Sequence, residues 1–205
     1  MNLKAIRLFL WVMVAVAAVV AGGFAVYTKF GKSAATEAGL SKPMTGIGGP
    51  FELIDQTGKP FTDKSLPGQP TAMFFGYTHC PDVCPTTLGE AQVWFKDLGP
   101  AADKLRFVFV TVDPERDTPE VMKGYLGAFG DRFMGLTGAA DKVAAMLKSY
   151  HVFSRKVPDP NGKDYTLDHT AAIYLLDAQG RFVGIINYQE ETAKAEAKLK
   201  ALIGS

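Results

Sequence analysis

The sequence is poor in several features that define broad classes of protein. It has only two cysteines in 205 residues, so at most one disulfide can form within a chain. Its 22 basic and 21 acidic side chains nearly cancel, and no basic stripe is present that could displace counterions from phosphates. No internal repeat or low-complexity tract occurs. These absences argue against a nucleic-acid-binding protein and a repeat protein, and the composition fits one globular domain plus an apolar segment.

The apolar segment lies at the N-terminus. No charged side chain occurs from Leu8 to Thr28, a run of 21 residues. A helix rises about 1.5 Å per residue, so this run can span a hydrocarbon core of ~30 Å. Trp11 and Tyr27 lie near its ends, where amphipathic rings prefer the membrane interface. The run is longer than the roughly 7–15 residues of a signal-peptide core, so residues 1–30 are expected to form an uncleaved transmembrane anchor, with cleavage near the alanine-rich stretch as the alternative.

The flanking charges leave the orientation of this anchor open, because basic residues lie on both sides of it. A short N-terminal tail with the following domain outside the cytosol is the commoner arrangement. No long segment rich in arginine and serine precedes the anchor, which favours a bacterial protein over a mitochondrial precursor. We therefore expect a single-pass protein of the bacterial inner membrane whose soluble domain faces the periplasm.

The rest of the chain divides into a linker and one domain. Residues 31–50 are rich in small residues and predict a linker, and residues 51–205 have the size of a single domain. Apolar patterns predict strands over 51–54, 72–77, 106–112, 171–176 and 182–186, helices near 85–98, from 118, around 143–150 and over 191–202, and a polar loop around 159–162. This order, with a further short strand before the third helix, is typical of a thioredoxin-like α/β fold, in which helices flank a central sheet.

Both cysteines lie in one short segment, Cys80-Pro81-Asp82-Val83-Cys84. It follows the predicted buried strand over 72–77 and opens the next helix, near Pro85. Amide groups without partners and a partial positive charge at a helix start stabilise a thiolate over a thiol. A thiolate is both the nucleophile of disulfide exchange and the form that ligates a metal, so the segment predicts redox chemistry or metal binding.

A purely structural or redox role for the two cysteines is disfavoured. A disulfide across so short a loop restricts the unfolded chain little. A thioredoxin-type pair has C-x2-C spacing and a proline before the strand opposite, whereas here the spacing is C-x3-C and the segment reads Asp168-His169-Thr170. A peroxiredoxin has Thr three residues before its reactive cysteine, but Pro81 and Tyr77 occupy those positions here.

Metal binding is the third interpretation of the cysteine segment. In a thioredoxin-like fold, the loop before strand 171–176 faces the cysteine loop, so His169 can approach Cys80 and Cys84. Two thiolates and one imidazole suit Cu(I). A Cys2His set with an open fourth position also suits zinc, so the ligand types leave the metal undecided.

Four motifs occur in order along the domain: Gly-Tyr-Thr-His-Cys-Pro-Asp-Val-Cys-Pro at 76–85, Val-Asp-Pro-Glu-Arg-Asp-Thr at 112–118, Gly-Leu-Thr-Gly at 135–138 and Asp-His-Thr at 168–170. Their residues and spacing make residues 50–190 resemble the Sco/SenC family. The resemblance implies copper, as Cu(I) with Cu(II) as a second state, bound through Cys80, Cys84 and His169. It also implies a thioredoxin-like fold.

The same resemblance implies a partner. It points to maturation of the binuclear copper centre of cytochrome c oxidase subunit II, either by copper delivery or by reduction of that subunit's cysteines. Other copper chaperones are further candidate partners. We therefore expect mainly a metallochaperone. The alternative is a membrane-anchored thiol–disulfide oxidoreductase without a copper role, in which Cys80 and Cys84 are the redox pair.

The other histidines and the methionines have simpler interpretations. His79 directly precedes Cys80, and because adjacent residues rarely ligate one ion, it is expected beside the site or exposed. His151 is expected at a helix end. The seven methionines are scattered, with no cluster that would make a thioether copper site. Three of them stand at apolar positions and are expected in the core, namely Met73, Met122 and Met146.

Asp113 and Asp117 flank Pro114-Glu115-Arg116 after a predicted central strand. They are expected to cap the helix that starts at Thr118 and to pair with Arg116, since Asp readily caps helices. A catalytic carboxylate pair and a partner-docking role are alternatives for the same residues.

Overall fold

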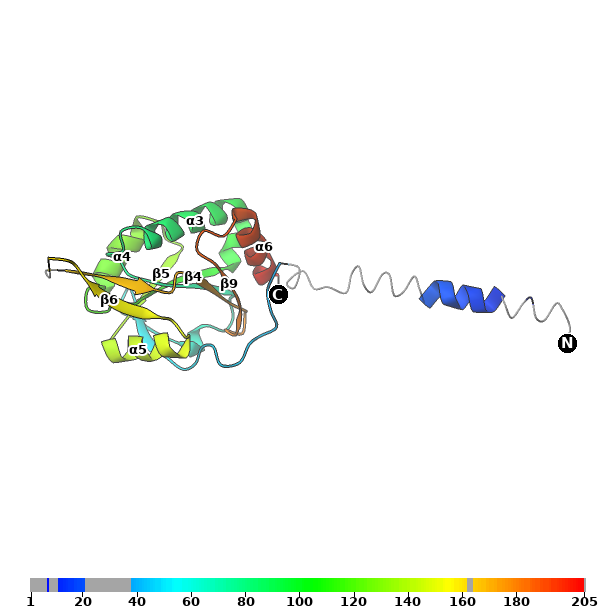
Figure 1. The fold of residues 1–205 in the computed structure, drawn as a ribbon, viewed down its shortest axis with the longest axis horizontal. Coiled ribbons are helices and arrows are strands. Elements are labelled where there is room, and N and C mark those ends of the chain that lie inside the picture. The colour runs from blue at the N-terminus through cyan, green and yellow to red at the C-terminus, as the bar shows by residue number, and fades with distance from the viewer. Residues whose placement is uncertain (1–6, 8–10, 21–37, 162–163, 205) are drawn as a thin grey trace.

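The computed structural model describes residues 7, 11–20, 38–161 and 164–204 (Figure 1). Most of the predicted anchor, residues 1–30, lies outside the described residues, as do residues 31–37 of the predicted linker. Residues 11–20 are helical. In the described part of the chain, no helix is both long and apolar enough to cross a membrane.

Seven strands form one mixed sheet in the order β2-β1-β5-β4-β3-β8-β9. The centre is parallel: β3 pairs with β4 and β4 with β5, while the outer pairs are antiparallel. β3 and β4 are buried along nearly their whole length, as their continuous apolar runs predict. The bounds of the strands are Glu52–Asp55 (β1), Pro60–Thr62 (β2), Thr71–Gly76 (β3), Arg106–Thr111 (β4), Phe133–Thr137 (β5), Ile173–Leu176 (β8) and Phe182–Ile186 (β9).

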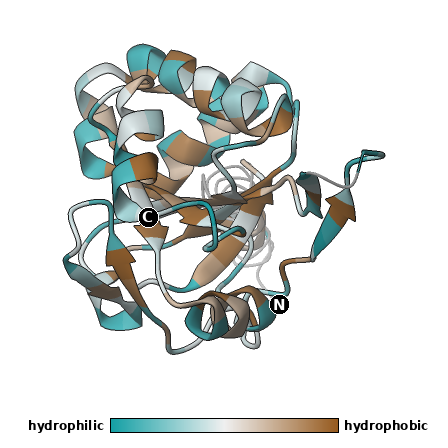
Figure 2. Cartoon of the chain, turned by 90° about the vertical axis from the view of Figure 1, so that its left-hand side faces the viewer, coloured by the Kyte–Doolittle hydropathy of each residue, from teal (hydrophilic) through white to brown (hydrophobic). Residues whose placement is uncertain are grey.

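Helices cover both faces of this sheet, as predicted. α3 and α6 pack together on one face, and α5 lies across the other (Figure 1). Apolar residues gather on the strands between these layers (Figure 2). The helices are Val83–Leu98 (α3), Pro119–Gly127 (α4), Ala140–Ser149 (α5) and Thr192–Ile203 (α6), with short 3-10 turns at Asp63–Ser65 (η1) and Gly99–Lys104 (η2).

A second, two-stranded sheet was not predicted. β6, Ser154–Pro158, pairs antiparallel with β7, Tyr165–His169, and the hairpin projects from the domain (Figure 1). Residues 159–161 of the predicted polar loop directly follow β6, and residue 162 lies outside the described residues. His169 is therefore the last residue of a strand, and the prediction that it lies in a loop is wrong. All five residues of β6 are exposed or half-buried, and its sequence lacks the apolar run by which the other strands were found.

Three segments meet at one end of the central sheet. Because β3 and β4 are parallel and Gly76 lies opposite Thr111, the loops that follow the two strands leave from the same end of the sheet. β8 runs antiparallel to β3, so the chain also enters β8 at this end. The cysteine segment, the loop over 112–118 and the end of β7 are thereby brought together. We call this end of the strands the metal end of the sheet.

Candidate metal centre

The cysteine segment is a tight turn followed directly by a helix. The Cys80 amide donates to the Tyr77 carbonyl at 3.2 Å, which closes the turn. α3 begins at Val83, two residues before the expected start, so Cys84 lies in its first turn. Asp82 occupies the N-cap position but makes no side-chain cap. The Cys84 amide instead donates to the Cys80 sulfur at 3.4 Å, so this sulfur accepts one of the amides that a helix start leaves unpaired.

Packing and one hydrogen bond orient the His169 ring. Its edge contacts are with Phe74 and Tyr77, at centroid distances of 6.1 and 5.8 Å. Nδ1 lies 3.1 Å from the Thr170 carbonyl oxygen. A carbonyl can only accept, so Nδ1 carries the proton, and in a neutral ring the lone pair is on Nε2. Nε2 lies 3.6 Å from the Cys84 sulfur, which is the orientation that a ligating histidine needs.

The three predicted ligand residues converge. The donor atoms of Cys80, Cys84 and His169 all lie within 4.8 Å of one another, and both thiols are free. Cys84 is buried and Cys80 half-buried. A groove of about 330 Å³ between the cysteine segment and β7 reaches Cys80 and His169 from the surface. Two sulfurs and one imidazole nitrogen at this spacing fit a soft ion such as Cu(I), and their chemistry also allows zinc.

The two sulfurs differ in their affinity for a proton. The hydrogen bond from the Cys84 thiol, together with those from backbone amides, lowers the pKa of Cys80 to about 3. The same hydrogen bond, together with burial, raises the pKa of Cys84 well above its ordinary value. At neutral pH the pair is therefore a Cys80 thiolate beside a Cys84 thiol, and a metal that binds both sulfurs releases the Cys84 proton.

Gly76, the last residue of β3, makes room for Cys84. A Cβ atom at this position would lie 2.7 Å from the Cys84 sulfur and 3.0 Å from the Phe109 ring. Any side chain here would push the ligand away from its place. The sequence prediction missed this role, although a glycine at the end of an otherwise bulky buried strand is a signal of close approach.

The remaining histidines and methionines are where they were expected. His79 is exposed, and its Nδ1 lies 3.1 Å from the Thr78 hydroxyl. His151 follows α5 with a positive φ of 54°, and its Nε2 bonds to the Gly46 carbonyl oxygen at 2.9 Å. Neither belongs to the metal-binding cluster found among the described residues. The methionines expected in the core, Met73, Met122 and Met146, are fully buried.

The two aspartates of the 112–118 loop divide their roles. Asp113 pairs with Arg116, as predicted. Thr118 caps α4 by accepting from the Val121 amide at 3.3 Å. Neither aspartate caps this helix, and Asp117 does not pair with Arg116, so those parts of the prediction are wrong. The buried Asp117 carboxylate accepts from the hydroxyls of Thr78 and Thr111, each at 2.6 Å. No local pattern indicates this contact, because Thr78 is 39 residues away.

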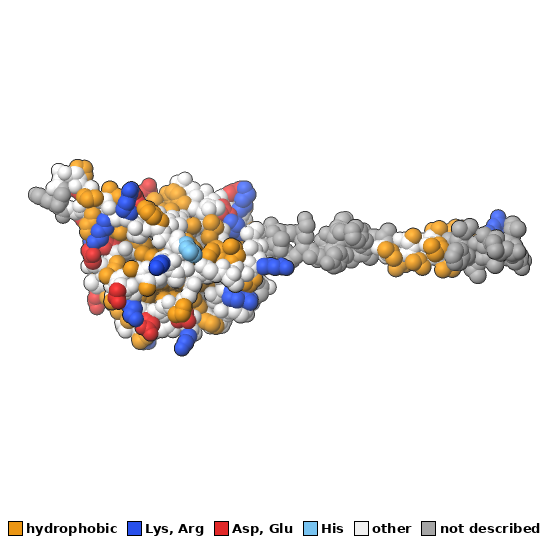
Figure 3. Space-filling model, turned by 60° about the horizontal axis from the view of Figure 1, so that its bottom comes forward, with side chains coloured by type: hydrophobic (Ala, Val, Ile, Leu, Met, Phe, Trp, Pro, Cys, Tyr) orange, Lys and Arg blue, Asp and Glu red, His pale blue; other side chains and the backbone are white. Residues whose placement is uncertain are grey.

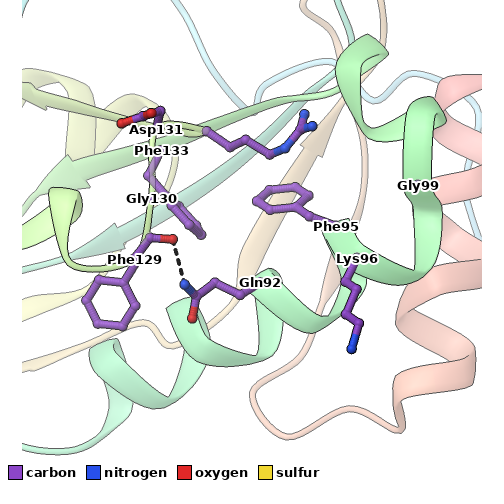
Figure 4. A pocket seen from close by; sticks show the side chains of 9 residues that line it. Gln92, Phe95, Lys96, Gly99, Phe129, Gly130, Asp131 and Phe133 are labelled. Carbon is purple, nitrogen blue, oxygen red and sulfur yellow. Dashed lines mark hydrogen bonds between the residues drawn. The ribbon is translucent and has the colours of Figure 1, made fainter.

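A second hollow, of about 440 Å³, lies between α3 and the loop that follows α4 (Figure 4). The Gln92 side chain bridges it by donating to the Phe129 carbonyl at 2.6 Å (Figure 4). None of the three candidate ligands lines it. On the face drawn in Figure 3, basic and acidic side chains are interspersed, which agrees with the balanced composition.

A thioredoxin-like sheet with two thiols and an imidazole at the end of its central strands defines a thioredoxin-fold protein with a metal centre. The family model described as SCO1/SenC matches residues 41–204, and the chain belongs to this family. The match begins ten residues before the domain start expected at Phe51.

Individual relatives agree with this assignment. The mitochondrial protein SCO2 of Saccharomyces cerevisiae is 40% identical over 151 residues, which cover 71% of this chain and 50% of that protein. A structure of Bradyrhizobium japonicum ScoI with copper bound is 52% identical, with a TM-score of 0.71, and the match covers 76% of this chain and 99% of that one. Yeast Sco1 with copper bound is 36% identical, with a TM-score of 0.70, over 78% of this chain and 89% of that one. The chain spans about half the length of the curated yeast relatives it matches.

Proposed function

We propose that this protein binds copper through Cys80, Cys84 and His169 and serves the assembly of cytochrome c oxidase. The observation that carries the proposal is the convergence of three donor atoms within 4.8 Å from segments 85 residues apart in sequence. Family membership and the copper-bound relatives favour copper over zinc for this donor set.

The three residues would contribute differently to the bound ion. Cys80 is already a thiolate and provides the first sulfur. Cys84 provides the second after losing its proton, and the Nε2 atom of His169 provides nitrogen. A three-ligand site of this kind leaves room for a ligand from a partner, which suits a protein that passes its ion on. The groove beside Cys80 gives the partner access to the site.

The finer expectations concern the partner and the location. We infer that the partner is subunit II of cytochrome c oxidase, with copper delivery or reduction of its cysteines as the step performed. We also infer that Leu8–Thr28 anchors the protein in the bacterial inner membrane and that the domain faces the periplasm. The length of the uncharged run supports the anchor. Deleting residues 1–30 should move the protein from the membrane to the soluble fraction of a cell extract; a deletion variant that still sediments with the membrane would contradict this.

A thiol–disulfide oxidoreductase is a second candidate function. The observation that favours it is the unequal cysteine pair, because a stable thiolate beside a thiol can attack a disulfide and then be released by the second sulfur. This function needs Cys80 and Cys84 but not His169. Replacing His169 should therefore impair copper binding and leave disulfide exchange intact.

Copper titration of the full chain in its dithiol and disulfide forms tests the proposed function. The same sulfurs cannot form a disulfide and act as two thiolate ligands, so the dithiol form should retain one Cu(I) after dialysis and the disulfide form almost none. Equal retention by both forms would rule out the two-thiolate site. Loss of cytochrome c oxidase activity in a cell that lacks the protein, restored by the wild type but not by Cys84→Ser, would support the assembly role.

A further inference from the structure

The loop between β4 and α4, residues 112–118, contacts both segments that carry the metal ligands. We propose that this clamp loop positions the ligands, with Asp117 holding the turn that ends at Cys80 and Asp113 with Arg116 holding the strand that ends at His169. The inference rests on the proposed function for the identity of the metal, while the positioning itself rests on contacts within the domain.

The first arm of the clamp loop is Asp117. Its side chain is buried, and its carboxylate accepts from the Thr78 hydroxyl at 2.6 Å and from the Thr78 amide at 3.2 and 3.3 Å to the two oxygens. Thr78 stands inside the turn closed by the Cys80 amide and the Tyr77 carbonyl. Holding both the backbone and the side chain of Thr78 fixes this turn, and thereby the direction in which Cys80 leaves it.

The Asp117 backbone is itself held in place. Its carbonyl accepts from the Thr137 hydroxyl of β5 at 2.6 Å, and its amide donates to the Asp113 carbonyl at 3.0 Å. The Thr111 hydroxyl of β4 donates to the Asp117 carboxylate at 2.6 Å. The first arm is therefore attached to the two neighbouring strands of the central sheet, which makes it a rigid support for the cysteine turn.

The second arm is Asp113 with Arg116. The Asp113 carboxylate, whose side chain is fully buried, accepts from the Tyr165 hydroxyl at 2.8 Å and pairs with the Arg116 guanidinium. Arg116 also donates to the Tyr165 carbonyl at 3.0 Å and stacks on the Tyr165 ring at 3.8 Å. Tyr165 begins β7 and His169 ends it, so the second arm fixes the strand whose far end carries the imidazole.

The two arms are linked because both form a hydrogen bond with the Thr111 hydroxyl. Thr111 accepts from the Asp113 amide at 2.8 Å and donates to Asp117. The Tyr77 hydroxyl adds a direct tie by accepting from the Leu167 amide at 3.1 Å, in the middle of β7. The spacing between the cysteine turn and β7 is therefore set by one short loop attached to β4 and β5.

The opposite end of the sheet provides a matched control. Asp177 is also buried, at 5% exposed, and follows a central strand as Asp113 and Asp117 do. Its carboxylate accepts from the amides of Gln179 and Arg181 at 3.0 and 2.9 Å and from the Arg181 guanidinium at 2.8 Å. All these donors lie within four residues, so Asp177→Asn weakens a buried carboxylate network without touching a segment that carries a ligand.

The test is a competition titration of the reduced full chain with Cu(I) and a chromophoric Cu(I) chelator. Tyr165→Phe removes one hydroxyl, Thr78→Val another, and Asp117→Asn the charge that accepts from Thr78. Each should weaken Cu(I) binding by about 10–100-fold, the range found when a group that orients a ligand is removed. Asp177→Asn should lower the melting temperature about as much as Asp117→Asn does, but leave the affinity for Cu(I) unchanged.

Amide hydrogen exchange in the metal-free reduced protein gives a readout that does not depend on copper. Tyr165→Phe and Thr78→Val should speed exchange at the Cys80 and Leu167 amides, whereas Asp177→Asn should speed it only at Gln179 and Arg181. We call Tyr165→Phe and Thr78→Val the clamp variants. Exchange rates at Cys80 and Leu167 equal to those of the wild type in both would overturn the inference. Unchanged Cu(I) affinity in folded Tyr165→Phe would overturn it as well. If Asp117→Asn fails to fold, these two milder variants decide.

His169→Ala separates a failure of this inference from a failure of the proposed function. If it binds Cu(I) as tightly as the wild type, the copper site is wrong, and hydrogen exchange alone decides whether the clamp loop positions the two segments. If it binds weakly while the clamp variants keep wild-type affinity and exchange, the site stands and the positioning role is overturned.

Discussion

The two ends of the central sheet differ in how their buried carboxylates are bonded. The end with the β8–β9 turn buries one carboxylate, and the metal end buries two, each in a loop that follows a strand. At the β8–β9 turn, every donor to Asp177 lies within four residues, so the contacts close a local turn. At the metal end, Asp117 and Asp113 accept from Thr78 and Tyr165, which are 39 and 52 residues away. Buried carboxylates that join distant segments mark the end where ligand geometry must be kept.

Glycine is used differently at the two ends as well. Gly180 in the β8–β9 turn has a φ of +77°, a conformation that side chains disfavour, so its role is to let the chain turn. Gly76 at the metal end has no positive φ and is required because a Cβ atom there would lie 2.7 Å from the Cys84 sulfur and 3.0 Å from the Phe109 ring. One glycine serves the fold, and the other serves the site.

The largest effect should come from His169→Ala. Losing a ligand should weaken Cu(I) binding by more than about 100-fold, the upper range for losing a group that only orients one. Because the ring packs against Phe74 and Tyr77, the free energy of unfolding should also fall, by about 1 kcal/mol. Competition titration against a Cu(I) chelator measures the affinity. His79→Ala is the control: it removes an exposed imidazole next to Cys80 and should bind as the wild type does. Equal affinity of the two variants would contradict the assignment.

Gly76→Ala should have the next largest effect. Overpacking between Cys84 and Phe109 should cost about 1–3 kcal/mol of unfolding free energy and also weaken Cu(I) binding. Gly180→Ala should destabilise by a similar amount, because a Cβ there would lie 2.9 Å from Leu66 and the φ is positive, yet keep the wild-type affinity. Urea unfolding and copper titration of both variants check this. If both lose affinity equally, the two ends do not differ as described.

A smaller effect concerns the pH dependence of cysteine alkylation in the reduced, metal-free protein. An ordinary thiol, with a pKa of about 8.5, loses reactivity about tenfold for each unit of falling pH. Because the pKa of Cys80 is lowered to about 3, its thiolate persists, and its alkylation rate should stay nearly constant between about pH 8 and 5. Cys84, with its raised pKa and buried sulfur, should react very slowly throughout.

Peptide mapping by mass spectrometry after timed exposure to iodoacetamide measures both rates. A Cys80 rate that falls tenfold per pH unit would contradict the thiolate assignment. Denatured protein, in which both cysteines regain ordinary pKa values, provides the reference.

The smallest effect should come from Thr71→Val at the end of the sheet away from the ligands. It removes a buried hydroxyl that donates to the Gln69 carbonyl at 3.1 Å, and should cost about 1 kcal/mol of unfolding free energy. Thermal unfolding measures the loss. The affinity for Cu(I) should not change. A loss of affinity as large as that of Thr78→Val would mean that any hydroxyl lost from β3 or its following turn disturbs the site.

The sequence predicted the parts of the fold that leave strong local signals. The apolar runs of β3 and β4, the start of the helix near 118 and the last two strands are confirmed, with bounds shifted by at most two residues. The β6–β7 hairpin was missed because its side chains are largely exposed and carry no apolar run, although Asp159-Pro160-Asn161-Gly162 is a strong turn signal. Local patterns therefore find elements that bury themselves and miss those that do not.

The candidate site was predicted only in part, for a related reason. The cysteines were recognised as reactive or metal-binding from their place at a helix start. Spacing alone left the role of His169 open, and the resemblance to the Sco/SenC family was needed to assign it. The supporting residues have no local signature. Asp117 looks like a helix cap, and only the folded chain brings it to Thr78. Contacts between residues far apart in sequence cannot be inferred from the pattern of either segment.

X-ray absorption at the copper edge of the Cu(I)-loaded protein reports the ligand set itself. We expect two sulfur scatterers and one nitrogen scatterer per copper in the wild type and in His79→Ala. In His169→Ala the nitrogen should be lost while both sulfurs remain. A nitrogen shell that persists in His169→Ala, or a single sulfur in the wild type, would contradict a centre built from Cys80, Cys84 and His169.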